Sequence, residues 1–303
     1  MSALDCVIVG AGPAGITAAV YAARKRMDFI VVTQDVGGQT ALSADVENYT
    51  GYQFITGAEL VGKFEEHLKQ FDVVLKNGTA VTRIRRAADG TFLVDTKKES
   101  FSCRTVVVAS GRRPRRLDVP GEEALRNKGV TYCATCDGPL FAGKDVAVIG
   151  GGNAALDAAL QMVRIAGKVF LVNINDRLGG DAVMREKVQA SDKVEVLNAA
   201  VTKEIYGGPF VQGIKVEQKG GPRDLAVEGV FIEVGSVPNS DIVDFVKKNE
   251  AGEIVVDNLN RASVPGVFAA GDVTNVPEKQ IIVAAGEGAK AVLGVFRYLS
   301  QTR

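Results

Sequence analysis

The sequence predicts an α/β protein with two domains, each built around a largely parallel β-sheet. Two glycine-rich turns, at residues 10–15 and 150–155, each follow a short apolar run and precede an alanine-rich segment with helical spacing. A buried strand that passes through such a turn into a helix begins a dinucleotide-binding, Rossmann-like unit. The 303 residues are about the length of two domains. We therefore expect two dinucleotide-binding domains in one chain.

The composition excludes several classes of protein. Lysine plus arginine and aspartate plus glutamate both number 36, so the formal net charge is zero and nothing favours a nucleic acid or an anionic membrane as partner. The mean hydropathy is only +0.09, and no apolar run approaches the ~20 residues of a membrane span. A strand-like stretch begins at residue 6 without a basic leader, so we expect no signal peptide. Four cysteines in 303 residues are not a disulfide scaffold, and this cysteine usage favours a cytoplasmic location.

The first turn lies between a predicted buried strand at 6–10 and a predicted helix at 16–24. Gly10 makes the tight turn, Gly12 lets the backbone approach a pyrophosphate, and Gly15 lets helix and strand pack closely. The free N–H groups and positive dipole end of the helix then face the anion. The turn therefore predicts a dinucleotide site.

The acidic residue that usually ends the next strand and binds ribose is not in its expected place. The strand ends in Thr33, with Asp35 slightly later, so the fingerprint is incomplete there. Gly38, Gln39 and Asn48 follow, and they combine close backbone approach with amide donors and acceptors. The alternative interpretation of this stretch is an ordinary polar loop.

Periodicity and turn residues predict the other elements of the first half. We expect a strand at 29–32, a helix at 58–70, an antiparallel meander at 79–84, 92–95 and around 101, and a buried strand at 105–109. The basic, proline-containing segment at 112–120 is typical of a solvated interdomain crossing.

The second turn has the pattern Gly-x-Gly-x-x-Ala and lies between a buried strand at 146–149 and a helix that ends near residue 165. Further strands at 169–172, 194–197, 211–216 and 230–234 would complete this domain.

The chain then returns to a short buried strand that ends in Gly271-Asp272. An aspartate there can accept hydrogen bonds from ribityl or ribose hydroxyls. A long amphipathic helix is predicted at 281–299, and its N-terminal dipole would favour negative charge on a bound ring.

Cys133 and Cys136 form a Cys-x-x-Cys motif that Asp137 follows directly. This spacing lets the sulfurs close a small disulfide ring or open to a dithiol in which one pKa is lowered. Asp137 is placed to supply or accept the proton that ring opening needs. Its alternative role is to cap the helical turn after Cys136.

The alternatives for the motif itself are half a zinc site or two inert thiols. Zinc needs four ligands, and Cys6, Cys103 and the single histidine, His67, form no second ligand-spaced pair. We therefore expect no metal. Cys6 and Cys103 lie in apolar, strand-like surroundings and are predicted core residues, as in a cytosolic protein with one functional pair.

Together these motifs resemble the low-molecular-weight thioredoxin reductase family over essentially the whole chain. Segments 130–133, 138–141 and 279–282 are still more similar to the flavoprotein subunit of alkyl hydroperoxide reductase. Because the first strand begins at once, we expect the N-terminal thioredoxin-like domains of that flavoprotein to be missing. An outside thioredoxin-like protein is then the implied electron acceptor.

The resemblance implies two three-layer ββα dinucleotide-binding domains, the second inserted in the first. Residues 1–113 and 244–303 would bind FAD, and residues 114–243 would carry the dithiol and a nicotinamide site. The candidate catalytic residues are Cys136 facing the flavin, Cys133 attacking the partner disulfide, and Asp137 as proton donor. Homodimers are implied. The FAD-binding residues implied are Gly10, Gly12, Pro13, Ala14, Gly15, Gly38, Gln39, Asn48, Gly111, Gly271, Asp272, Lys279, Gln280 and Ile281.

The implied second dinucleotide site departs from the family. It comprises Gly150, Gly152, Asn153, Ala154 and Asn173. NADPH-using relatives carry a His-Arg-Arg run where this chain has Asn-Ile-Asn at 173–175, and Asp157 and Ala158 replace paired glutamates. Arginine forks hold the 2′-phosphate of NADPH, so their loss predicts poor NADPH use unless Arg177 or Arg185 substitutes. NADH is the leading nicotinamide donor, followed by a ferredoxin-like donor.

The resulting hypothesis is an FAD-dependent reductase of a thioredoxin-like protein disulfide. A peroxiredoxin system fed by NADH and a ferredoxin-dependent flavin thioredoxin reductase are variants of it. A flavin NAD(P)H oxidase or diaphorase would need FAD but not the cysteines. A redox sensor without turnover is a further alternative.

Overall fold

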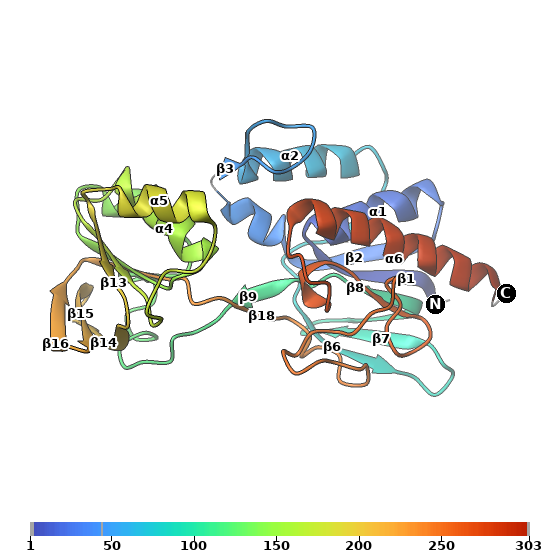
Figure 1. The fold of residues 1–303 in the computed structure, drawn as a ribbon. Coiled ribbons are helices and arrows are strands. Elements are labelled where there is room, and N and C mark those ends of the chain that lie inside the picture. The colour runs from blue at the N-terminus through green and yellow to red at the C-terminus, as the bar shows by residue number, and fades with distance from the viewer. Residues whose placement is uncertain (1–2, 44, 302–303) are drawn as a thin grey trace. The chain divides into compact units, whose positions relative to one another are not determined.

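The computed structural model describes residues 3–43 and 45–301 and divides into two compact units (Figure 1). Unit 1 comprises Met1–Arg113 and Val237–Arg303, and unit 2 comprises Pro114–Ser236. The chain thus returns to unit 1 at Val237, seven residues earlier than the expected 244. The two connecting segments pair with each other as β9 (Arg112–Pro114) and β18 (Ser236–Pro238).

Unit 1 has a seven-stranded sheet whose main path runs β5-β2-β1-β8-β7-β6, with β19 also paired to β8. The parallel part consists of β1 (Leu4–Ala11), β2 (Phe29–Val36), β5 (Val74–Lys76), β8 (Ser100–Val108) and β19 (Val267–Ala269). Strands β6 (Val81–Arg86) and β7 (Phe92–Thr96) add an antiparallel meander. A parallel sheet must be covered on both faces, which explains its nearly continuous apolar strands.

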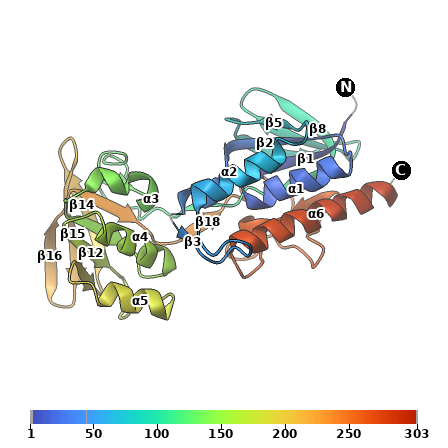
Figure 2. The same cartoon turned by 90° about the horizontal axis from the view of Figure 1, so that it is seen from above.

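The two faces of the unit 1 sheet have separate cores. Cys6 and Ile8 of β1 face α1 (Pro13–Arg24) and α6 (Ile281–Gln301), which lie side by side (Figures 1 and 2). Val7 and Val9 point to the other face, against the meander and the segment that contains Val243 and Ile254. Because successive side chains of a strand point to opposite faces, β1 packs against the helices on one face of the sheet and against the meander on the other.

Five further elements of unit 1 are short strands or helices outside the seven-stranded sheet. They are η1 (Gly38–Leu42), the short pair β3 (Asp45–Val46) and β4 (Ile55–Thr56), α2 (Gly57–Leu68) and η3 (Gly271–Val273). Helix α2 begins with a capping box, in which Thr56 and Glu59 satisfy each other's backbone N–H groups.

Unit 2 contains a five-stranded parallel sheet in the order β10-β17-β11-β12-β13. Its strands are β10 (Val130–Thr131), β11 (Val146–Ile149), β12 (Val169–Val172), β13 (Val194–Leu197) and β17 (Gly229–Ile232). The helices are α3 (Ala134–Asp137), η2 (Gly138–Phe141), α4 (Asn153–Val163) and α5 (Ala182–Gln189). A separate antiparallel sheet comprises β14 (Val201–Gly207), β15 (Val211–Gln218) and β16 (Gly221–Ala226).

The α/β class with two dinucleotide-binding folds is confirmed, and one local prediction needs correction. The strand predicted near residue 101 and the buried strand at 105–109 are one strand, β8, which joins the meander to the parallel core. Helix α5 was not predicted, nor were strands β14 and β16, which pair with the two edges of β15. Only Val188 of α5 is fully buried, so its apolar periodicity is weak, but its N-cap Asp181 is a recognisable start signal.

Candidate redox-active site

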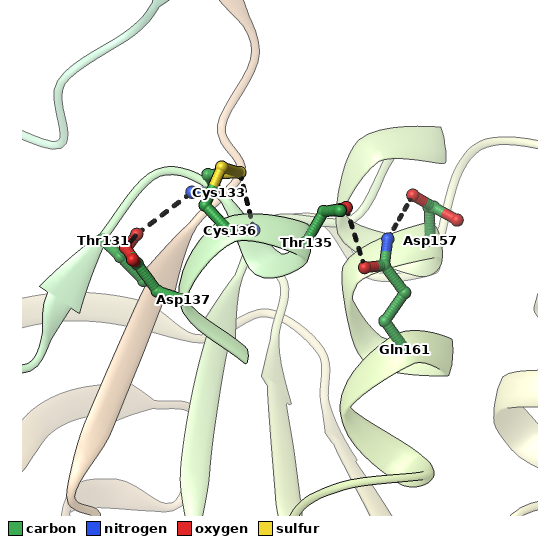
Figure 3. Close-up of a disulfide and its surroundings, with 7 residues drawn as sticks. All are labelled: Thr131, Cys133, Thr135, Cys136, Asp137, Asp157 and Gln161. Carbon is green, nitrogen blue, oxygen red and sulfur yellow. Dashed lines mark hydrogen bonds between the residues drawn. A yellow bond between two sulfur atoms is a disulfide. The ribbon is translucent and has the colours of Figure 1, made fainter. Parts of the chain in front are cut away.

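Cys133 and Cys136 form a disulfide with a Cα–Cα distance of 5.3 Å (Figure 3). Cys133 follows the end of β10 in an extended conformation and is the N-cap of α3, so the chain turns between the two cysteines. The Cys133 sulfur accepts a hydrogen bond from the Cys136 backbone N–H at 3.0 Å. Cys136 is exposed and Cys133 half-buried. The sulfurs are therefore open to reductants and already next to a backbone donor.

Asp137 is linked to Cys133 through a buried hydroxyl (Figure 3). Thr131 is 6% exposed, and its Oγ1 accepts from the Cys133 N–H at 3.2 Å while donating to Asp137 Oδ2. The carboxylate does not cap the following turn η2, which has no side-chain hydrogen bond at its N-cap. The alternative role of Asp137 as a helix cap is therefore wrong. Its carboxylate is instead connected to the Cys133 backbone N–H through the Thr131 hydroxyl.

Thr135 lies between the cysteines and is bound to helix α4 (Figure 3). Its hydroxyl donates to Gln161 Oε1 at 3.0 Å, and Gln161 Nε2 donates to Asp157 Oδ2 at 2.7 Å. No sequence pattern pointed to Gln161, because its role depends on the packing of α3 against α4.

The first glycine-rich turn leaves space only where a cofactor would need it. A Cβ on Gly15 would lie 1.9 Å from the Gly10 carbonyl oxygen, so this glycine serves helix–strand packing. A Cβ on Gly12 would come no closer than 3.9 Å to any protein atom, at the Gly37 carbonyl oxygen. Gly12 is also the N-cap of α1 and brings no side chain to its first amides, and Pro13 is in the first helical turn. This cradle fits a pyrophosphate.

Other predicted FAD-binding residues meet around this turn from distant segments. A Cβ on Gly38 would lie 3.6 Å from Gly12 Cα. Gln39 Nε2 donates to the Arg112 carbonyl at 2.5 Å. Asn48 Nδ2 donates to Gln280 Oε1 at 3.1 Å, just before α6 begins at Ile281. Segments separated by more than 200 residues are thus joined by side-chain amides.

Asp272 and Lys279 lie in a charged cluster within unit 1. Burial raises the pKa of the Asp272 carboxyl, whereas the charges of Lys279 and Arg112 lower it. Lys279 and Arg112 both pair with Glu253, at 2.9 and 2.8 Å. The Gly271 N–H donates to the buried Glu287 carboxylate at 3.1 Å.

Close packing or a left-handed backbone conformation accounts for the residue type at three more predicted positions, Ala14, Gly111 and Gly271. Gly111 has φ of 63° and open space at its Cβ position. Ala14 is approached closely by Gly271 and Gly288, since a Cβ on Gly288 would lie 2.0 Å from the Ala14 carbonyl oxygen. Helix α6 therefore rests directly on the first turn.

The second turn has the same form in unit 2. Gly150 has φ of 146°, and a Cβ there would lie 2.2 Å from the Glu233 carbonyl oxygen. Gly152 is the N-cap of α4 and has open space. Asn153 Oδ1 accepts from the Asp181 N–H at 2.7 Å, and Ala154 is exposed.

Asn173, the predicted ribose ligand, is only 1% exposed. Its Nδ2 donates to the Asn175 carbonyl and to Asn198 Oδ1, and its Oδ1 accepts from the Asn175 N–H. Both N–H donors of its side-chain amide, and its amide oxygen, are thus bonded to protein atoms.

The family model of pyridine nucleotide-disulphide oxidoreductases matches residues 4–288. The chain belongs to that family of oxidoreductases. Membership implies FAD and a pyridine nucleotide as cofactors.

The chain is similar to particular members over nearly all of its own length. The F subunit of alkyl hydroperoxide reductase from Pseudomonas putida is 42% identical over 99% of this chain and 59% of that protein. The chain therefore spans about three-fifths of the curated relatives it matches. Thioredoxin reductase of Lactococcus lactis has a TM-score of 0.93 and 34% identity, covering 98% of this chain and 99% of that one. For T. acidophilum thioredoxin reductase these values are 0.91 and 35%, with both chains fully covered.

The oxidoreductase fold also positions a buried carboxylate that the sequence did not indicate. Glu122 is 1% exposed and accepts hydrogen bonds from the Tyr132 hydroxyl and from the backbone N–H groups of Leu117 and Asp118. Burial and this carboxylate raise the pKa of Tyr132 to about 12. The residue directly before Cys133 is thereby fixed to the segment that enters unit 2.

A second unpredicted carboxylate, Glu233, follows β17 beside Gly150. Burial, and then the charge of Asp157, raise the pKa of Glu233 to about 8. The pair lies at the carboxyl end of the parallel sheet, where ligands of such sheets bind.

A pocket of about 580 Å³ in unit 2 contains both arginines near the second turn. Its lining residues are Asn175, Arg177, Leu178, Gly179, Arg185 and Gln189. Gly179 donates its N–H to the Gly151 carbonyl at 2.8 Å, which places the pocket against the turn.

The other two cysteines are core residues, as predicted. Cys6 and Cys103 are buried, and burial raises the pKa of the Cys6 thiol to about 12 and that of Cys103 still further. Among the described residues, no group of three His, Cys, Asp or Glu side chains could hold a metal ion. Within residues 3–43 and 45–301, no helix is long and apolar enough to cross a membrane.

Proposed function

We propose that the protein is an FAD-dependent protein-disulfide reductase, with the Cys133–Cys136 pair as its redox-active centre. The observation that carries the proposal is the exposed disulfide whose backbone is linked through Thr131 to Asp137. Two electrons and two protons convert this disulfide to a dithiol. When bound, FAD supplies the transfer of those electrons from a donor.

The arrangement of the pair supports a division of roles between the sulfurs. A Cys133 thiolate would attack the partner disulfide, and Cys136 would then displace the partner as a dithiol and restore the ring. Asp137 would take up and return the proton of the pair, while the Thr131 hydroxyl holds its carboxylate beside the Cys133 backbone. The Cys136 N–H donor at the Cys133 sulfur favours negative charge on that atom.

The residues around the first turn fit the cofactor. Gly12 leaves room for a pyrophosphate, α1 offers uncapped amides, and Asp272 is a partly buried acceptor for a hydroxyl. We propose that FAD is held by unit 1 through Gly10, Gly12, Pro13, Ala14, Gly15, Gly38, Gln39, Asn48, Gly111, Gly271, Asp272, Lys279, Gln280 and Ile281.

For the electron donor we propose NADH ahead of NADPH, bound at Gly150, Gly152, Asn153 and Ala154, with Asn173 supporting the strand end. The basis is the missing arginine run at 173–175. The similarity to the F subunit of alkyl hydroperoxide reductase supports a peroxiredoxin-linked, thioredoxin-like acceptor. A ferredoxin-like donor is the second candidate, because a ferredoxin-flavin thioredoxin reductase of Clostridium acetobutylicum is 31% identical with a TM-score of 0.55.

The decisive experiment compares turnover in cysteine variants. Wild type, Cys133→Ser and Cys136→Ser would each be supplied with NADH and a thioredoxin-like substrate, with Cys103→Ala as a control thiol outside the site. Partner reduction should fall at least about 100-fold in the first two variants and stay near wild type in the control. Undiminished turnover in Cys136→Ser would reject the scheme, and cysteine-independent oxygen consumption would favour an oxidase.

Two further proposals concern the oligomeric state of the protein and its location in the cell. A homodimer is expected, and sedimentation of the FAD-loaded protein at several concentrations would test it. A cytoplasmic location is inferred from cysteine usage and would be tested by fractionation of cells.

A further inference from the structure

Helix α6 carries a buried carboxyl group, Glu287, that has no part in the scheme above. The residue is only 6% exposed. Its Oε2 accepts a hydrogen bond from the Gly271 N–H at 3.1 Å, and Thr274 Oγ1 lies 3.4 Å from the same oxygen. Burial of a carboxyl group is costly unless its oxygens find hydrogen-bond partners. The contacts of both oxygens therefore need an explanation.

The second oxygen of this carboxyl group, Oε1, has no hydrogen-bond partner among the residues that the structure describes. In that part of the chain, the only fully enclosed side-chain oxygens or nitrogens without a partner are Thr202 Oγ1 and Asn260 Oδ1. Glu287 Oε1 is therefore not fully enclosed, and the small exposed fraction of the residue includes this atom. A buried side chain thus presents one free oxygen to open space.

Contacts on both sides of Glu287 place it between the first glycine-rich turn and Asp272. The next residue of α6, Gly288, packs so closely on α1 that a Cβ would lie 2.0 Å from the Ala14 carbonyl oxygen (Figures 1 and 2). The residue bonded to Oε2, Gly271, precedes Asp272, and a Cβ on Gly271 would lie 3.0 Å from Ala14 Cβ. Glu287 therefore adjoins two parts of the proposed FAD site, the cradle and the acidic acceptor, within one unit.

We infer that Glu287 is a further FAD-binding residue, whose Oε1 forms a hydrogen bond with a hydroxyl group of the ribityl chain or of the adenosine ribose. The inference rests on the proposed function, because it concerns the cofactor that unit 1 is proposed to hold. Through Oε2 the same side chain holds the Gly271 N–H, and so it also positions the turn that carries Asp272.

A hydroxyl group is the part of FAD that matches this oxygen. It can donate to a carboxylate and accept from a carboxylic acid, so it suits either protonation state of Glu287. The pyrophosphate offers no proton to a carboxylate and repels its charge. Hydroxyl-bearing carbons flank the pyrophosphate on both sides, whereas the N–H donors of FAD belong to the two ring systems at its ends. A carboxyl group beside the cradle is therefore placed for a hydroxyl.

A cycle that combines protein variants with cofactor analogues tests the contact. Flavin-free wild type and Glu287→Met would be titrated with FAD and with analogues that each lack one hydroxyl of the ribityl chain or of the ribose, using flavin fluorescence. In wild type, the analogue without the bonded hydroxyl should bind about tenfold more weakly than FAD. In Glu287→Met this penalty should shrink to within about twofold. The analogue that responds distinguishes a ribityl from a ribose contact.

A second variant covers the case in which Glu287→Met does not fold. Glu287→Gln keeps the size of the side chain and an acceptor for the Gly271 N–H. Because a neutral amide is a weaker partner, the penalty should be at least about threefold smaller than in wild type. Glu278→Gln is the matched control, since it removes an exposed carboxylate just before α6 and should leave every penalty at its wild-type value.

The outcomes separate this inference from the proposed function. If wild type binds FAD but every analogue is penalised equally in wild type and in the folded Glu287 variants, Glu287 acts only by holding Gly271. That result would overturn the inference and leave the proposed function intact. If wild type binds no FAD, both fail.

Discussion

The glycine-rich turns of unit 1 and unit 2 make the same backbone contact but meet different side chains. A Cβ on Gly10 would lie 2.3 Å from the Ala109 carbonyl oxygen, and a Cβ on Gly150 would lie 2.2 Å from that of Glu233. The first glycines are therefore equivalent. The residue that follows the neighbouring strand is the buried Ala109 in unit 1 and Glu233, with its raised pKa, in unit 2.

The turns also differ in what closes them. In unit 1, Gly15 sits against Gly10, and helix α6 brings Gly288 against Ala14 from the far end of the sequence. In unit 2, Ala155 replaces the third glycine, and Asn153 is fixed by the nearby Asp181. The first turn thus packs against the far end of the sequence, whereas the second is closed by Asp181 and Glu233, which belong to its own unit.

The largest expected effect concerns the third position of each turn. Gly15→Val would place side-chain atoms on the Gly10 carbonyl, since even a Cβ lies 1.9 Å away. We expect loss of more than ~4 kcal/mol of folding free energy and no soluble flavoprotein. Ala155→Gly should cost only about 2 kcal/mol, through helix propensity and one lost methyl group. Thermal melts of both variants test this contrast, and a stable Gly15→Val protein would contradict it.

The second prediction separates the two cofactors. Gly12→Val and Gly152→Val both place a side chain in open space, so both proteins should fold. Gly12→Val should purify without FAD, while Gly152→Val should keep FAD and bind NADH at least about 100-fold more weakly. Flavin absorbance and NADH titration give the readouts. Full FAD occupancy in Gly12→Val would show that the first turn has been misassigned.

These contrasts indicate what can be predicted from sequence. Both turns were predictable because their function depends on glycines within six residues, and the Cys133–Cys136 pair because its chemistry needs only local spacing. The double role of β8 was not predictable, since one strand pairs with β1 on one side and β7 on the other.

Contacts between side chains on different elements could not be predicted from the sequence either. Gln161, Glu122 and Glu233 acquire their roles from residues on other elements, and their own surroundings in sequence carry no motif. Asn173 could be placed at a strand end but not shown to be buried and fully hydrogen-bonded within the protein.

The third prediction uses the carboxyl group that distinguishes the second turn. The pKa of Glu233 is raised to about 8, so the folded protein holds a proton that the unfolded chain releases near the ordinary value of 4.5. Stability contributed by Glu233 is complete below that ordinary value and is lost as the pH rises through about 8. The loss amounts to at most ~5 kcal/mol.

Glu233→Gln keeps the size of the side chain but removes its titration. The variant should match wild type at pH 5 and be more stable by a few kcal/mol at pH 9, as measured by urea unfolding. Asp157→Asn should give a smaller change of the same sign, because the Asp157 charge is the lesser cause of the shift. Parallel stability curves for wild type and Glu233→Gln would disprove the raised pKa.

The smallest expected effect tests whether the second turn is held locally. Asn153→Ala removes the acceptor of the Asp181 N–H, whose distance is 2.7 Å, and frees the start of α5 from the turn. The loss of one hydrogen bond at a partly exposed site should cost about 1 kcal/mol. NADH affinity should fall several-fold, while FAD content stays unchanged because the first turn lies in the other unit. If Asn153→Ala lost FAD as readily as NADH, the two turns would not be independent, and the contrast between long-range and local closure would fail.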